Sequence, residues 1–213
     1  EIVTKSEILD KIQKTGRAEG RNSMGVSESF YDPYYLLKKF KNFEELEQKL
    51  KDKSCVLSEP ISQHDVIYST KSNGEEFTSA KEGDVIIRIR HLKDKAQLNL
   101  KQQRSGEMDN LEYETEVEDP EEMHKILTTL GWKPVIEVKK MRRKGKLGKY
   151  EVCLDEVEKL GTFVELEKLT GDDANPEEVR EELFKELESL GLSRTDEETR
   201  GYDTQIYFLE LKK

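Results

Sequence analysis

Several segments of the sequence alternate between apolar and charged residues, and their charged residues are of the types that bind phosphate or metal ions. In GTFVELEKL, residues 161–169, Val164 and Leu166 alternate with Glu165 and Glu167. Successive side chains of a strand point to opposite faces, so this pattern predicts a strand with one apolar face and one acidic face. The same alternation gathers other charges on one strand face, namely Arg88 and Arg90 in IIRIRHL and Glu112, Glu114 and Glu116 in LEYETEVED.

The charged strand faces divide by sign. The cations are Arg88, Arg90, Lys101, Lys140 and Arg142, and the carboxylates are Glu114, Glu116, Asp155, Glu165 and Glu167. Arginine and lysine bind phosphate oxygens through charge-assisted hydrogen bonds. Neighbouring carboxylates repel one another and favour Mg²⁺ or Mn²⁺, which can bridge to the same phosphate oxygens. The two sets together predict a ligand that is a chain of phosphates, either a nucleoside triphosphate or inorganic polyphosphate.

An alternative interpretation is that these polar faces simply meet water, as one face of an antiparallel sheet commonly does. Two observations favour an enclosed location instead. The predicted helices are amphipathic and need an apolar sheet face to cover, which leaves the charged faces inside. A solvated face also tends to mix charges of both signs, whereas these faces do not. We therefore expect the charges to line the interior of a barrel.

Three helices are predicted by their end signals. Asn42, Asp119 and Asn175 are the expected N-caps, and proline follows directly after Asp119 and Asn175. Gly131 and Gly191 are expected to end the second and third helices. These helices cover about residues 41–52, 119–131 and 175–191, and a weaker signal predicts a further helix over 4–14.

Eight strands are predicted between the helices, at 34–41, 55–69, 84–92, 95–103, 111–118, 134–144, 149–155 and 162–168. Short connections such as KDK at 93–95 and KGKLGK at 144–149 imply antiparallel pairing. The sequence thus predicts an α+β fold, an eight-stranded antiparallel β-barrel with amphipathic helices packed outside. Residues 1–28 are interpreted as an amino-terminal extension of unknown role, and 29–213 as the domain.

Composition narrows the class of protein further. The chain has 213 residues, 38% of them charged, and a formal net charge of −10, which argues against a general nucleic-acid binder. The basic run at 139–149 is interpreted as the tip of a hairpin, and its residues Lys140 and Arg142 are expected to bind phosphate. No membrane span or signal peptide is predicted. Cys55 and Cys153 are expected to be reduced thiols of a cytoplasmic protein.

A resemblance to a known family rests on seven motifs that occur in the family's order. They are RIR (88–90), LNLK (98–101), EYETEVED (112–119), LGW (130–132), KMR (140–142), CLDEVEKLGTFVELE (153–167) and RGY (200–202). In this order they resemble the CYTH superfamily, the triphosphate tunnel metalloenzymes. Class IV adenylyl cyclases, thiamine triphosphatases and tripolyphosphatases belong to that superfamily. The resemblance covers about residues 29–213.

The resemblance implies a role for each matching residue and a Mg²⁺ or Mn²⁺ cofactor. The triphosphate would be ATP, thiamine triphosphate or polyphosphate, and a homodimer is one option for the assembly. Lys39 and Lys101 are the candidate catalytic residues. The residues implied to bind the triphosphate are Arg88, Arg90, Lys101, Lys140, Arg142 and Arg200. The residues implied to bind the metal ion are Asp155, Glu165 and Glu167, and Glu114 and Glu116 would belong to the same acidic side of the site.

One departure from the family leaves two functions open. The hallmark E-x-E-x-K of the first strand corresponds here to YLLKK, in which Tyr35 and Leu37 replace the acids and only Lys39 remains. The chain start EIVTK offers Glu1 and Lys5 at similar spacing, but it lies too early and runs into a helix signal. The first hypothesis is a cyclase or triphosphatase, with the cyclase-like branch favoured. The second is a nucleotide or polyphosphate sensor that has lost catalysis with its first-strand metal ligands.

Overall fold

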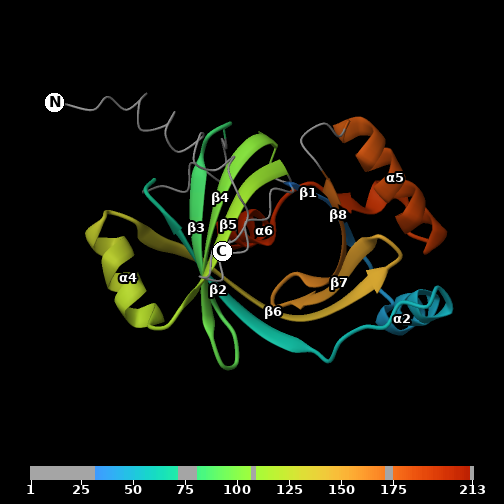
Figure 1. The fold of residues 1–213 in the computed structure, drawn as a ribbon, viewed down its shortest axis with the longest axis horizontal. Helices are drawn as coiled ribbons and strands as arrows, with labels where there is room; N and C mark the ends of the chain where they lie inside the picture. The colour runs from blue at the N-terminus through green and yellow to red at the C-terminus, as the bar shows by residue number, and fades with distance from the viewer. Residues whose placement is uncertain (1–31, 72–80, 107–108, 171–174, 212–213) are drawn as a thin grey trace, which may run out of the picture.

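The fold is built on one antiparallel sheet that curls around a hollow interior (Figure 1). The computed structural model describes residues 32–71, 81–106, 109–170 and 175–211, so the predicted helix at 4–14 and the extension 1–28 lie outside the described residues. The strands are β1 (Asp32–Lys39), β2 (Ile61–Ser69), β3 (Val85–His91), β4 (Ala96–Gly106), β5 (Asp109–Val117), β6 (Lys133–Leu147), β7 (Tyr150–Val157), β8 (Gly161–Thr170) and β9 (Glu197–Glu198).

The strand order is β5-β4-β3-β2-β6-β7-β8-β1-β9, and every paired neighbour is antiparallel. The curl brings β1 close to β5, although within the described residues no hydrogen-bonded ladder joins these two strands. The predicted antiparallel tunnel is therefore confirmed. All eight predicted strands are present, and the two-residue β9 adds a ninth.

The helices are α2 (Phe43–Asp52), α4 (Pro120–Thr129), α5 (Pro176–Ser189) and α6 (Tyr202–Glu210). The three predicted N-caps are confirmed, because the side chains of Asn42, Asp119 and Asn175 each accept a hydrogen bond from a backbone N–H in the first turn. This contact satisfies one of the donors that a helix start leaves without an intrahelical partner. None of the described helices is long and apolar enough to cross a membrane.

Three of the four α-helices in the described residues cover the outside of the curled sheet. Leu46 and Leu50 of α2 and Leu183 and Leu187 of α5 share one core with outward-facing residues of β7 and β8, such as Val152. At the other side of the molecule α4 packs on β2 and β3, where its residue Leu127 shares a core with Tyr68, Ile87 and Ile89. The apolar strand faces thus lie under helices, as predicted, and the charged faces turn inward.

The fourth helix, α6, was not predicted, and it lies on the inner side of the sheet (Figure 1). Its residue Ile206 is 1% exposed and packs among Leu37, Ile67 and Phe163, which are inner-face residues of three strands. The sequence YDTQIYFLE does not predict a helix, because Tyr, Ile and Phe favour strands and because Gly201 has no side chain to cap the first turn. The helix therefore forms an apolar floor at one end of the tunnel.

Replacing Ile206 with alanine is expected to cost about 2–5 kcal/mol in the free energy of unfolding, because the cavity left beneath α6 cannot fully collapse. Urea denaturation followed by circular dichroism measures this loss. Leu211→Ala is the matched control, since Leu211 is 63% exposed just after α6 and should change stability by less than about 0.5 kcal/mol. Equal losses for the two variants would show that α6 is not anchored by Ile206.

The second predicted strand was placed too early, because β2 begins at Ile61 and residues 55–60 are not strand. The backbone N–H of Cys55 still bonds to Leu50 of α2, and Pro60 has no N–H to donate to a ladder. This segment crosses closely over β6: a Cβ added at Gly145 would lie 2.8 Å from Cys55 Sγ. The absence of a side chain at Gly145 allows that crossing.

Candidate functional site

The inner face of the sheet encloses a cavity of about 350 Å³. Its wall is formed by inward positions of the strands, by Gly201 and by the first residues of α6, Tyr202 to Thr204. Most of the predicted charges meet here, which places cations and carboxylates in one shared space. The charged lining residues are Asp65, Asp84, Arg88, Arg90, Lys101, Glu112, Glu114, Lys140, Arg142, Lys144, Glu151, Glu165, Glu167 and Asp203.

Strand register explains why these side chains converge. Directly opposed residues of antiparallel strands point to the same face. The ladder between β3 and β4 pairs Arg88 with Asn99, and the ladder between β4 and β5 continues from Asn99 to Glu114. On the other side of the cavity, Arg142 of β6 is opposite Asp155 of β7. A shift of one residue in either ladder would turn the whole set outward.

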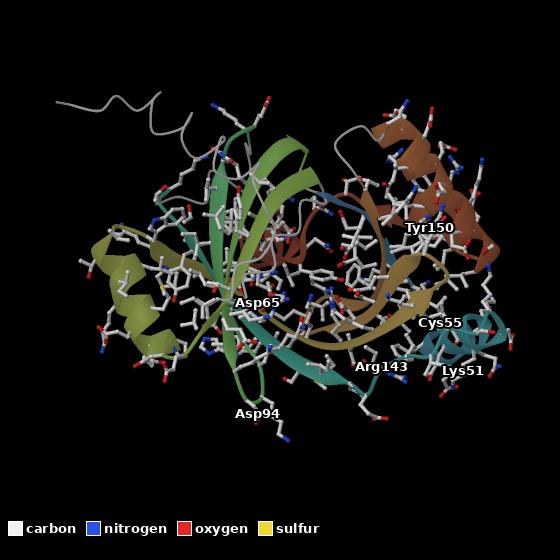
Figure 2. All side chains as sticks on the ribbon, viewed as in Figure 1. Lys51, Cys55, Asp65, Asp94, Arg143 and Tyr150 are labelled. Atoms are coloured by element: carbon white, nitrogen blue, oxygen red, sulfur yellow. The ribbon has the colours of Figure 1, made fainter. Side chains whose placement is uncertain are left out.

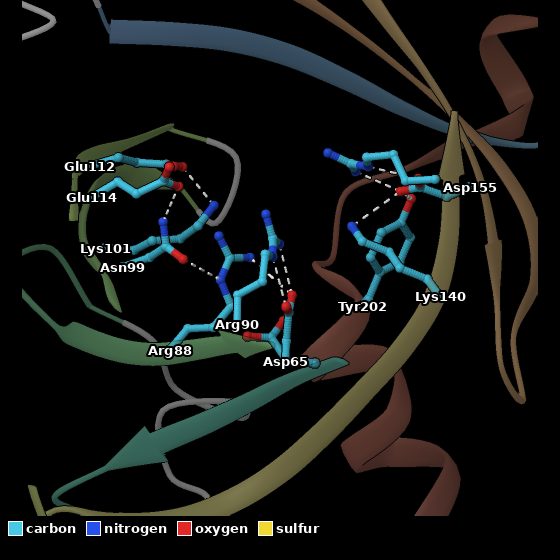
Figure 3. Close-up of polar contacts among 12 residues, drawn as sticks. Asp65, Arg88, Arg90, Asn99, Lys101, Glu112, Glu114, Lys140, Asp155 and Tyr202 are labelled. Atoms are coloured by element: carbon cyan, nitrogen blue, oxygen red, sulfur yellow. Dashed lines mark hydrogen bonds and ion pairs between the residues drawn. The ribbon is translucent and has the colours of Figure 1, made fainter. Parts of the chain in front are cut away.

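The arginines of β3 are held by a carboxylate from β2 (Figure 3). Asp65 accepts hydrogen bonds from Arg90 Nε at 2.7 Å and from a terminal nitrogen of Arg90 at 2.8 Å, and Arg88 contacts it at 3.3 Å. Burial alone would raise the pKa of Asp65, but the guanidinium groups of Arg88 and Arg90 hold that pKa well below its usual range. Asp65 is therefore ionised at neutral pH.

The cations of β6 are held in the same way by Asp155 of β7, which is fully buried. Arg142 donates to Asp155 at 2.7 and 2.5 Å, and Lys140 lies 3.2 Å from it. The Tyr202 hydroxyl of α6 also donates to Asp155, at 2.9 Å. Burial and the neighbouring Arg142 lower the pKa of Lys140 to about 8, so Lys140 is mostly protonated at neutral pH.

The opposite end of the cavity carries a second mixed group. Lys101 of β4 lies 2.6 Å from Glu112 of β5. Glu114 accepts hydrogen bonds from Gln97, at 2.6 Å, and from Asn99, whose own side-chain oxygen accepts from Arg88 at 3.2 Å. This chain of contacts links the acidic strand β5 to the arginines of β3.

Glu151, Glu165 and Glu167 line one wall of the cavity and crowd one another. Burial, together with the charges of Glu165 and Glu151, raises the pKa of Glu167 to about 7. Glu165 also contacts Arg142 at 2.9 Å. Among the described residues, no group of three or more His, Cys, Asp or Glu is arranged to hold a metal ion by itself. The wall nevertheless carries excess negative charge that a cation would relieve.

Four predicted site residues are absent from the cavity lining. Asp155 is buried and contacts the lining residues Lys140, Arg142 and Tyr202, whereas the other three lie apart from the cavity. Lys39 has an exposed side chain, with Nζ 5.6 Å from the centre of the Phe163 ring. Arg200 is paired on the surface with Glu198 at 2.9 Å. Glu116 contacts Lys95 in a separate surface hollow. The predicted roles of these three residues remain predictions, and the structure does not bring them to the other charges.

The position of the missing first-strand acids can be read from the pairing of β1 with β8. Leu37 is directly opposite Glu165, and Tyr35 is opposite Glu167. The Leu37 side chain is 2% exposed and packs with Phe163 and Ile206 in the apolar floor. An apolar residue thus occupies the place on β1 that lies nearest to Glu165 along the ladder.

Sequence reasoning did not propose several lining residues as site residues, chiefly Asp65, Glu151 and Tyr202. Asp65 could have been found by alternation, because it shares its strand face with Gln63 and Ile67 in ISQHDVIYS. The basic run at 139–149 is not a free cationic surface. On the outside Arg143 pairs with Glu47 and Lys149 with Glu182, and Lys144, which lines the cavity, pairs with Glu151.

Two curated relatives match part of the chain. A protein of Methanocaldococcus jannaschii, provisionally named an adenylate cyclase, is 36% identical over 91 residues, which are 43% of this chain and 52% of that protein. Adenylate cyclase CyaB of Aeromonas hydrophila is 34% identical over 88 residues, 41% of this chain and 46% of that protein. The chain thus matches about half the length of these curated relatives.

Solved structures and a family model extend the likeness to most of the chain. A Pyrococcus horikoshii protein has a TM-score of 0.67 and 26% identity, covering 80% of this chain and 96% of that one. A Hippeastrum protein has a TM-score of 0.55 and 19% identity, covering 84% and 95%, which shows the fold alone. Its structure is described as that of a provisional adenylyl cyclase with a dominant triphosphatase activity. Finally, the model of the CYTH domain matches residues 35–202, more than half of the sequence, and the chain therefore belongs to the CYTH domain family.

Proposed function

We propose that the cavity binds the triphosphate of a nucleoside triphosphate or a polyphosphate together with a divalent cation, and that the protein turns this ligand over. The observation that carries the proposal is the convergence of five cations on one enclosed space, namely Arg88, Arg90, Lys101, Lys140 and Arg142. They come from three strands, β3, β4 and β6, and so can contact successive phosphates of an extended chain.

The acidic wall fits a cation that is shared with the phosphates. Mg²⁺ is commonly bound through one or two carboxylates plus substrate oxygens, not through a complete protein cage. Glu165 and Glu167 supply such a pair, and the raised pKa of Glu167 reflects the repulsion that a cation would remove. Asp155 fits this role less well, because Arg142, Lys140 and Tyr202 already donate to it. A bound cation would neutralise charge on the phosphoryl oxygens.

The residues of the chain itself would act mainly by positioning and by charge neutralisation. The arginines and lysines hold the phosphate oxygens, and they stabilise negative charge that builds up during transfer. Of the two candidate catalytic lysines, Lys101 faces the cavity and Lys39 does not. The floor formed by α6, with Tyr202 against Phe163 at 5.1 Å between ring centres, closes one end of the site to water.

Two reactions are compatible with this arrangement. In a cyclase the ribose 3′-hydroxyl attacks the α-phosphate, which gives cyclic AMP and releases pyrophosphate. In a triphosphatase water attacks a terminal phosphate. The names of the two curated relatives favour cyclisation, whereas the activity described for the Hippeastrum protein favours hydrolysis.

A triphosphate sensor without turnover is the second candidate function, and one observation favours it. Leu37 is buried opposite Glu165, so β1 offers an apolar side chain where a further cation ligand would be useful. Fewer carboxylates lower the affinity of a site for hard cations. A protein of this kind would bind its phosphate chain and release it unchanged.

The test is to incubate the protein with ATP, thiamine triphosphate or tripolyphosphate plus Mg²⁺ or Mn²⁺ and to measure phosphate, pyrophosphate and cyclic AMP. We expect Glu165→Gln to lower turnover by at least about 100-fold, because one of the two carboxylates proposed to bind the divalent cation is lost. Glu137→Gln is the control, since Glu137 is 58% exposed and pairs with His64 away from the cavity.

Each possible result has a distinct meaning. Turnover that disappears in Glu165→Gln and persists in Glu137→Gln supports the enzyme. Binding of tripolyphosphate to the wild type without any product supports the sensor. Absence of both binding and turnover for all three ligands would refute the proposed function.

A further inference from the structure

Asp65 is a buried carboxylate of the cavity that sequence analysis and family resemblance did not assign to the site. It is 3% exposed and lies on the inner face of β2, near the middle of the molecule (Figure 2). Arg143, by contrast, lies on the outside toward α2. A buried carboxylate requires partners that compensate its lost hydration. The identity of those partners indicates what Asp65 does.

Both oxygens of Asp65 are engaged by arginines of the next strand. Its two contacts with Arg90, at 2.7 and 2.8 Å, involve Nε and a terminal nitrogen, so the planar guanidinium is held in a forked arrangement. Arg88 is fixed from two sides, by Asp65 at 3.3 Å and by Asn99 at 3.2 Å. Such contacts restrict the rotation of long side chains that would otherwise adopt many rotamers.

The neighbouring wall repeats the arrangement. Asp155 engages Arg142 through two contacts and Lys140 through one, and β2 and β6 are adjacent in the sheet. Two buried carboxylates therefore support four cations, in two groups that Figure 3 shows side by side in one view. Without Asp65 the guanidinium groups of Arg88 and Arg90 would repel each other and Arg142 across the cavity.

We propose that Asp65 is a positioning residue that aims Arg88 and Arg90 at the phosphate chain. This inference rests on the proposed function, and it adds a residue that does not itself touch the ligand. The proposal predicts the direction in which the affinity for a polyphosphate changes when Asp65 is replaced. Removing a negative charge beside a polyanion site should strengthen binding if charge alone mattered, whereas loss of alignment should weaken it.

The experiment measures tripolyphosphate affinity by calorimetry for the wild type, Asp65→Asn and Asp65→Glu. The asparagine variant removes the charge, and the glutamate variant keeps the charge but moves it by one methylene. We expect both to bind at least about tenfold more weakly than the wild type, because each breaks the forked contact. Glu47→Gln is the matched control, since Glu47 pairs with Arg143 outside the cavity and should leave affinity unchanged.

A second measurement separates positioning from simple loss of structure. The Nε–H of Arg90 is held by Asp65, and its proton should exchange slowly with water in ¹⁵N-resolved NMR spectra. In both Asp65 variants that protection should be lost while the backbone spectrum stays folded. Thermal unfolding then sets a temperature at which all variants remain native for the affinity measurement.

Several results would overturn the inference. Asp65→Asn binding as tightly as the wild type, or more tightly, would leave only a charge effect. Asp65→Glu behaving like the wild type would show that alignment is unimportant. A wild type that binds none of the phosphate ligands would refute the proposed function and this inference with it, whereas the first two results would leave the proposed function intact.

Discussion

Replacing Arg142 with methionine is expected to destabilise the protein by about 3–5 kcal/mol and to abolish measurable binding of tripolyphosphate. The Arg142 side chain is 8% exposed and neutralises Asp155, which is fully buried, and Glu165. Burial would lower the pKa of Arg142, but Glu165 and Asp155 raise it well above its usual value, so the pair is ionised throughout the neutral range. Methionine would leave two carboxylates without their main partner.

Arg143→Met provides a control with the same chemical change one residue away. Arg143 faces outward, where it donates to the Ser58 carbonyl and lies 3.1 Å from Glu47. A partly exposed pair of this kind contributes about 0–1 kcal/mol. Urea denaturation gives the stabilities and calorimetry the affinities. Similar losses for the two variants would contradict the assignment of Arg142 to the interior, because the two positions differ mainly in the face of β6 that they occupy.

The fold was largely predictable because its signals are local. Helix caps such as Asp119 and strand alternation such as Val164–Glu165 depend on neighbouring residues, and both were confirmed. The helix α6 was not predictable in this way. Its residues favour strands, and the helix is stabilised by Ile206 packing against residues that are distant in the sequence. Tertiary packing overrides local preference there.

The site was partly predictable for a related reason. Alternation identified the charged faces, and the prediction that they share one interior space is confirmed by the common cavity. Alternation does not show how far along a strand the cavity extends. Lys39 and Glu116 were therefore predicted as site residues, although the structure places them outside the cavity. Alternation also could not show that Asp155 is saturated by cations, since that depends on the register between β6 and β7.

Charge balance links the stability of this protein to its proposed function. Asp65 and Asp155 neutralise the buried cations around them. Burial alone would raise the pKa of both carboxyl groups, but the neighbouring cations lower it below its usual value. Groups with lowered pKa stabilise the fold above about pH 4 and lose that contribution as the pH falls through their folded values. Glu167 behaves in the opposite sense, because its pKa is raised.

The affinity for Mn²⁺ without any phosphate ligand is expected to rise about tenfold per pH unit up to about pH 7 and to level off above it. Burial and the charges of Glu165 and Glu151 raise the pKa of Glu167 to about 7, so a cation must displace one proton below that value. The same shift predicts that the cation-free protein loses stability as the pH rises from about 5 to 7. The folded state binds more protons than the unfolded state in that window.

Glu167→Gln isolates this effect because it removes the titrating group and keeps the size of the side chain. In this variant both the slope of Mn²⁺ affinity against pH and the fall of stability between about pH 5 and 7 should disappear. Electron paramagnetic resonance of free Mn²⁺ and urea denaturation measure the two quantities independently. A slope that survives in Glu167→Gln would assign the proton to another group, and a flat wild-type profile would mean that cation binding does not displace a proton from Glu167.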